Sequence, residues 1–107
     1  MAWTVEPLNH IVLAELADLP KEMRAKFERI VGMIEDFGLT RLREPYVKHL
    51  QGPLWEMRMI GRDGIARAVY VTAVGERVVI VRVFRKKTQK TPLREIKLAL
   101  KRAEEIR

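Results

Sequence analysis

Cations concentrate in one short segment near the C-terminal end of the chain, Phe84-Arg85-Lys86-Lys87-Thr88-Gln89-Lys90-Thr91-Pro92. Within it, six consecutive residues hold four cations, Arg85, Lys86, Lys87 and Lys90. The segment joins a β-branched run to a predicted helix, and a helix N-terminus adds partial positive charge and free N–H groups. A phosphate beside Lys86, Lys87 and Lys90 would interact with these cations and with the helix N-terminus. The segment therefore predicts phosphate binding.

Other cations lie inside predicted regular elements. Arg67 is the lone charge in an otherwise apolar strand, where a cation costs free energy unless it reaches solvent or a partner. It is either a structural arginine, snorkelling or paired with Glu56, or part of a functional site. On the last predicted helix a basic flank is formed by Arg94, Lys97 and Lys101, for which a solvated helix face is the alternative.

Several catalytic chemistries are excluded by composition. Serine and cysteine are both absent, which excludes serine and cysteine nucleophiles and thiolate metal sites. The histidines, His10 and His49, lie far apart without a recognisable motif, and there is no glycine-rich phosphate loop. We therefore expect no metal site and no cofactor, and an enzyme of this sequence must work with Arg, Lys, Glu, Tyr or His.

The global charge agrees with a polyanionic partner. The chain has 107 residues, about one domain, and a net charge of +7. Counting along the sequence, residues 1–40 carry −3, residues 41–76 carry +2 and residues 77–107 carry +8. A basic third on an otherwise near-neutral domain creates a directional field, and nucleic acid is the leading partner. A solvated basic face, or one that meets an acidic protein segment, is the alternative.

The first half of the chain predicts a short strand followed by a helical hairpin. Residues 2–6 form an edge strand, and residues 9–19 form a helix with Asn9 as its N-cap. A second helix begins at Pro20, carries apolar residues at i, i+4, i+7, i+11 and i+14, and ends at Gly38. Residues 39–53 are expected to form an irregular connection, with one turn of helix around residues 46–50.

The second half predicts three antiparallel strands and a final helix. Residues 54–60, 65–72 and 77–84 are the strands, with Trp55, Met57 and Met59 facing the hairpin. Thr91 is the expected cap of the last helix, whose apolar stripe is Leu93, Ile96, Leu100 and Ala103. The whole chain, residues 1–107, is thus one α+β domain of order β-α-α-β-β-β-α. We expect no membrane span, no signal segment and a cytoplasmic location, which the absence of cysteine fits.

Three motifs together resemble a known family. They are Leu54-Trp55-Glu56-Met57-Arg58, Ile65-Ala66-Arg67-Ala68-Val69-Tyr70, and the basic segment 84–92 followed by Glu95-Ile96 and Ala99. In this order and at these intervals they resemble the phage-related HigB-like branch of the RelE/ParE toxin superfamily. The resemblance covers nearly the whole chain and implies a RelE-like small antiparallel sheet packed on an N-terminal helical hairpin, with a C-terminal helix.

The resemblance also implies an activity, that of a type II toxin which enters the ribosomal A site and cuts the mRNA there without a metal. The positions matching the RNA-cleaving residues of relatives are Arg58, Arg67, Lys86 and Lys87. On this hypothesis Arg67 and Lys87 stabilise the phosphorane, whereas Arg58 and Lys86 orient the RNA backbone. Contacts with RNA or the ribosome are expected from Glu56, Arg85, Lys90, Arg94, Lys97 and Lys101.

Proton transfer is left open, to a lysine of lowered pKa or to Glu56. Some relatives carry a lysine at the position of Glu56 and a tyrosine near that of Pro92, so the general base and acid do not carry over. The implied partners are the 30S ribosomal A site, mRNA and a helix-turn-helix antitoxin, with no membrane. A gyrase poison of the ParE type and a non-catalytic nucleic-acid-binding module are the competing functions.

Overall fold

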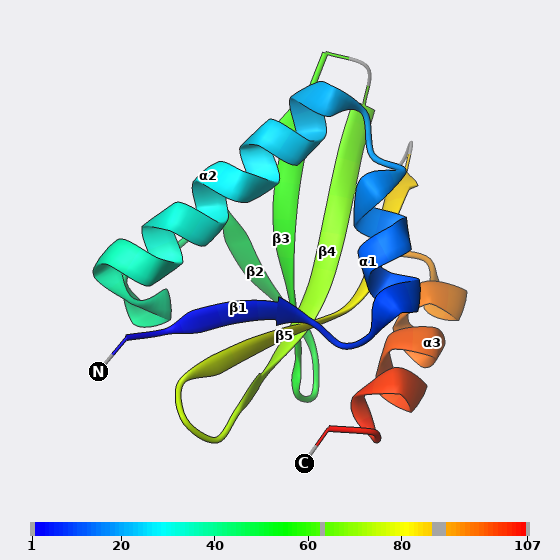
Figure 1. Ribbon diagram of the computed structural model, residues 1–107. Helices are drawn as coiled ribbons and strands as arrows, with labels where there is room; N and C mark the ends of the chain where they lie inside the picture. Colours follow the sequence, from blue (N-terminus) through cyan, green and yellow to red (C-terminus); the bar gives the residue numbers. More distant parts are fainter. Residues whose placement is uncertain (1, 63, 87–89, 107) are drawn as a thin grey trace.

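The computed structural model describes residues 2–62, 64–86 and 90–106, which form a five-stranded sheet with helices on both faces (Figure 1). The strand order is β1-β5-β4-β3-β2, with β1 parallel to β5 and every other pair antiparallel. This confirms the α+β class. Along the chain the elements are β1 (Thr4–Pro7), α1 (His10–Ala17), α2 (Lys21–Phe37), a 3-10 turn (Leu39–Arg41), β2 (Val47–Gln51), β3 (Leu54–Gly61), β4 (Gly64–Ala73), β5 (Arg77–Lys86) and α3 (Leu93–Ala103).

The helical hairpin forms as its sequence predicts. Asn9 caps α1, because its side-chain oxygen accepts the Val12 N–H at 3.1 Å. The predicted stripe of α2 is buried at Met23, Phe27, Ile30 and Ile34. Gly38 ends the helix at φ 87°, a backbone conformation that glycine adopts without steric cost. No helix within the described ranges combines the length and apolar character that crossing a membrane requires.

The expected helical turn around residues 46–50 is wrong, because this segment is the edge strand β2. It pairs antiparallel with β3, Val47 lying opposite Met57 and His49 opposite Trp55. Val47 is buried in the core beneath α2, whereas its neighbour Lys48 is exposed. Pairing with β2 gives the backbone groups along one edge of β3 their hydrogen-bond partners. Local sequence preferences do not reflect this long-range stabilisation.

Two apolar layers cover the two faces of the sheet. Met57, Met59 and Tyr70 belong to the core beneath α1 and α2. Leu54 and Val69 belong to the smaller core on the other face, beneath α3. The stripe of α3 differs from the prediction, since Ala99 is fully buried and Leu93 is exposed. The face that carries α3 is also the face that carries the polar site.

Candidate phosphate-binding site

A β-bulge in β5 determines which cation reaches the site. Val69 of β4 lies opposite Arg82, but the next residue, Tyr70, lies opposite Ile80, so Val81 is an extra residue in β5. Before the bulge Ile80 packs in the α2 core; after it Val83 does so, and Phe84 joins the α3 core. The alternation therefore shifts by one residue, which turns Lys86 rather than Arg85 toward the α3 face.

A polar cluster occupies this face at the end of β5. Its centre is Glu56 of β3, only 2% exposed, whose Oε1 accepts a hydrogen bond from Nη1 of the equally buried Arg67 on β4. Its Oε2 accepts from the hydroxyl group of Thr91 at 2.9 Å, and Lys86 Nζ donates to that hydroxyl oxygen at 3.4 Å. Arg58 lies directly across from Arg67 in the β3–β4 register and is partly exposed. We call Glu56, Arg58, Arg67, Lys86 and Thr91 the Glu56 cluster.

The charges of the Glu56 cluster are unbalanced, with one carboxylate among three cations. Burial lowers the pKa of Arg67, and nearby Arg58 lowers it further, whereas Glu56 opposes both effects. Burial also lowers the pKa of Lys86 to about 8, and the positive charges of Arg67, Arg58 and Lys48 act in the same direction. Crowded cations of this kind are stabilised by an incoming anion, so the cluster can bind a phosphate.

A second ionic group lies at the edge of β5, between α1 and α3, where Glu15 also accepts the Val83 backbone N–H at 3.0 Å. Arg82 of β5 donates to Glu95 of α3 at 2.7 Å and to Glu15 of α1 at 2.8 Å. Arg102 of α3 also donates to Glu15, at 2.9 Å, and to the Val81 carbonyl oxygen at the bulge. We call Glu15, Arg82, Glu95 and Arg102 the Arg82 network. Hydrogen bonding to Glu95 raises the pKa of Arg82, and Glu15 adds to this effect.

The predicted site residues divide by position. The structure brings together Arg58, Arg67, Lys86 and Glu56, and the salt bridge between Glu56 and Arg67 is present. Lys87 lies outside the described residues. The remaining predicted cations are exposed: Arg85, Lys90, Arg94, Lys97 and Lys101. The site therefore has a buried centre and, beside it, exposed cations along α3.

Thr91 and Lys48 belong to the site surroundings but are not apparent as site residues in the sequence. Thr91 stands immediately before a helix and reads as its cap, yet α3 has no side-chain cap bond. Lys48 lies in the strand that sequence patterns read as irregular, opposite Glu56. The place of Thr91 within the basic segment is the one signal that the sequence offers, but only the fold brings it to Glu56, 35 residues away. Among the residues that the structure describes, no three acidic or histidine side chains form a group able to hold a metal ion.

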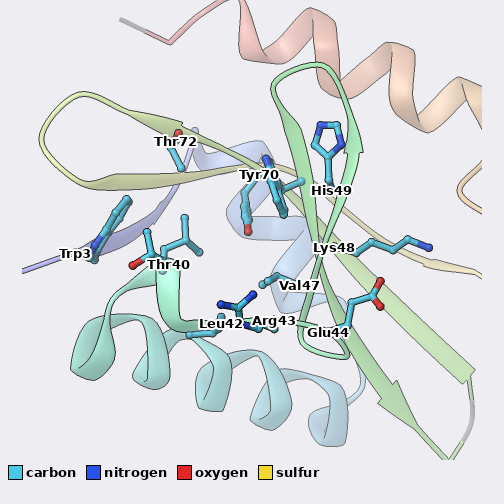
Figure 2. Close-up of a pocket in the computed structure, with 12 residues that line it drawn as sticks. Trp3, Thr40, Leu42, Arg43, Glu44, Val47, Lys48, His49, Tyr70 and Thr72 are labelled. Carbon is cyan, nitrogen blue, oxygen red and sulfur yellow. The ribbon is translucent and has the colours of Figure 1, made fainter.

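A cavity of about 930 Å³ lies on the other side of the sheet. Figure 2 shows Trp3 and Tyr70 around it, with Leu42 and Arg43 from the segment after α2. Trp55 also lines it, and Trp55 and Glu56 are neighbours on β3 whose side chains point to opposite faces. The sheet therefore lies between this cavity and the Glu56 cluster, and Lys48 of the edge strand β2 is the described residue common to the surroundings of both.

Comparison with known proteins places this geometry in a family. Among solved structures, the chain is similar to the E. coli toxin RelE, an arginine-to-alanine double mutant in the free state, with a TM-score of 0.66. The identity is 19%, over 95% of this chain and 98% of that one, and the likeness confirms the RelE-like fold. No curated protein matches the sequence. A family model described as phage derived protein Gp49-like matches residues 14–104, and the chain accordingly belongs to this family, the HigB-like branch that its motifs resemble.

Proposed function

We propose that this protein is the toxin of a type II toxin-antitoxin system and cleaves mRNA on the ribosome. The observation that carries the proposal is the Glu56 cluster, in which Arg58, Arg67 and Lys86 converge on one face of a RelE-like sheet. Burying these cations costs free energy, and a single carboxylate lies between them, so the arrangement suits an anionic ligand. The scissile phosphate of RNA is an anion of this kind.

RNA brings its own nucleophile, so the protein needs no nucleophilic side chain. The 2′-oxygen attacks the adjacent phosphorus, the bond from phosphorus to the 5′-oxygen breaks, and the products are a 2′,3′-cyclic phosphate and a 5′-hydroxyl end. The proton of the 2′-hydroxyl leaves to a base, and the 5′-oxygen receives a proton from an acid. The cluster would stabilise the additional negative charge of the phosphorane.

The positions of the side chains support a division of roles. Arg58 is partly exposed and Lys86 lies at the end of β5, so these two are proposed to contact the phosphate. Lys86, whose pKa of about 8 is near the working pH, is proposed as the general acid for the 5′-oxygen. Both oxygens of Glu56 already accept hydrogen bonds, from Arg67 and Thr91, which favours a counter-charge role for Glu56 over a general base. Lys87 is proposed to add to phosphorane stabilisation.

The exposed cations beside the cluster suit docking to ribosomal RNA. Arg85, Lys90, Arg94, Lys97 and Lys101 are proposed to contact the 30S A site and mRNA in the cytoplasm, through phosphates and without base specificity. The antitoxin is proposed to be a helix-turn-helix protein. An acidic segment of that antitoxin would compete with RNA for the basic face.

The decisive experiment maps mRNA 5′ ends after the purified protein is added to a translation extract. We expect cuts in phase with codons, and only when ribosomes are present. To test whether cleavage needs a metal ion, ribosomes are first crosslinked in magnesium so that they stay assembled, and excess EDTA is then added. The same cuts should appear with and without EDTA. Lys86→Met should lose the cuts, whereas Arg24→Gln, a charge removed from the exposed face of α2, should keep them. Intact mRNA with inhibited supercoiling by gyrase would instead show a ParE-type toxin. If neither effect occurs, the protein is a binding module.

A further inference from the structure

Thr91 uses its hydroxyl group in an unusual way for a residue that precedes a helix. A threonine at the N-cap itself, the position that the sequence suggests for Thr91, would accept a backbone N–H of the first turn. In this protein the N-cap of α3 is Pro92, and no side chain caps the helix. The Thr91 hydroxyl group instead donates to Glu56 Oε2 at 2.9 Å, and the residue is only 6% exposed. The hydroxyl group is thus buried in the Glu56 cluster and does not hold the helix.

The two hydrogen bonds of this hydroxyl group have a fixed direction. A hydroxyl group has one proton to donate, and the carboxylate of Glu56 can only accept it. The oxygen of Thr91 then presents its lone pairs to Lys86, whose Nζ donates at 3.4 Å. Thr91 is therefore an ordered link between a carboxylate on β3 and an ammonium group at the end of β5.

We infer that Thr91 is a positioning residue of the phosphate site, which holds the Lys86 ammonium group in place relative to Glu56 and Arg67. The inference rests on the proposed function, since it assigns the residue that orients the proposed general acid. Lysine has a flexible four-carbon stem, so a fixed acceptor beside its ammonium group narrows the positions that this group can occupy. The β-branched side chain of threonine is stiff, which makes it a good fixed point.

The matched pair Thr91→Val and Thr91→Ser tests this inference by cleavage. Valine keeps the shape and loses the hydroxyl group, whereas serine keeps the hydroxyl group. We expect Thr91→Val to lower kcat for ribosome-bound mRNA by about 10- to 100-fold, the size of loss that follows a misplaced catalytic group, with KM little changed. Thr91→Ser should retain most of the activity. Equal cleavage rates for Thr91→Val and the wild type would overturn the inference. Equal losses of cleavage in Thr91→Val and Thr91→Ser would also overturn it, provided that thermal unfolding shows both variants to be folded like the wild type.

A second measurement does not depend on catalysis. The pKa of Lys86 is followed by NMR titration of ¹³C-labelled lysine side chains, with Lys86→Met used to assign the signal. Thr91→Val removes an acceptor of the charged form, so its Lys86 pKa should fall below that of the wild type, and Thr91→Ser should restore it. An unchanged or higher value in Thr91→Val would show that Thr91 does not hold Lys86. If the wild type cleaves no mRNA, the proposed function fails, and the titration alone decides whether Thr91 positions Lys86.

Discussion

The Glu56 cluster lies on the α3 face of the sheet and the Arg82 network lies at the edge of β5 between α1 and α3, and the two are built on opposite charge rules. The Arg82 network pairs two carboxylates with two arginines and joins α1, β5 and α3. The Glu56 cluster sets one carboxylate against Arg58, Arg67 and Lys86. The same arginine chemistry therefore gives opposite results: the pKa of Arg82 is raised by its partners, whereas burial lowers that of Arg67.

This difference separates a structural ionic group from a functional one. In a balanced network each charge is compensated inside the protein, and removing one leaves another buried without its partner. In the Glu56 cluster three described cations surround one described carboxylate, so removing a cation is expected to relieve repulsion in the fold and to lower the affinity for an anionic ligand. Substitutions in the two groups should consequently move stability and activity in different directions.

The largest expected effect is the loss of cleavage in Lys86→Met. Removing the proposed general acid should lower the rate of mRNA cleavage by about 100-fold or more. Thermal unfolding should show a melting temperature no lower than that of the wild type, because methionine keeps the aliphatic stem and removes a buried charge. If Lys86→Met had a lower melting temperature and full cleavage activity, the Glu56 cluster would be a structural ionic group and not a functional one.

The next effect is a loss of stability in Arg82→Gln. This substitution leaves Glu95 without its arginine and Glu15 with Arg102 alone, and we expect the free energy of unfolding to fall by about 2 kcal/mol. Urea denaturation measures this change. Cleavage per folded molecule should stay near the wild-type rate, and a specific loss of activity in the folded fraction would place Arg82 in the site.

A pH series sharpens the comparison further. The pKa of Lys86 is about 8 in the folded protein against an ordinary 10.5, so between these values the unfolded chain binds more protons than the folded chain. This group alone therefore makes the folded state more stable as pH rises through that window. The stability advantage of Lys86→Met over the wild type, about 1–3 kcal/mol below pH 8, should disappear by about pH 10.5. If the stability difference between Lys86→Met and the wild type did not change with pH, the lowered pKa of Lys86 would not be its cause.

The smallest effects are expected at the exposed cations of α3. Single changes of Arg94, Lys97 or Lys101 to Gln should weaken binding to RNA by about twofold to fivefold and lower the slope of log affinity against log salt by about 1. Fluorescence anisotropy with labelled RNA at several salt concentrations measures both quantities. Arg24→Gln on α2 should change neither. An unchanged slope in the α3 variants would exclude these positions from phosphate contact.

Local patterns were sufficient for the elements whose own residues determine them. The apolar stripe of α2, its glycine end and the Asn9 cap all depend on neighbours within one helix, and each is confirmed. The salt bridge between Glu56 and Arg67 is one of the alternatives that the cost of burying a lone arginine left open. The strand β2 was missed because its stability comes from pairing with β3 and from the core that buries Val47.

The site itself was only partly predictable. Its residue types were apparent, because cations in apolar strands and beside a helix start are unusual. Thr91 was assigned to the wrong partner, since capping is the local preference and the bond to Glu56 is a long-range one. The position of Lys86 on the site face depends on the extra residue Val81, for which the continuous apolar run of β5 gives no signal.

The extra residue Val81 determines which of two neighbouring cations faces the site. Two basic residues stand side by side at the end of β5, and the parity of the strand decides which one enters the cluster and which one meets solvent. If β5 ran on without the bulge, composition and net charge would be the same, yet Arg85 would turn toward the cluster in place of Lys86, and an arginine that keeps its proton would replace a lysine able to give one up. Evolution can therefore alter the chemistry of this face through the presence or absence of a bulge, without replacing any charged residue.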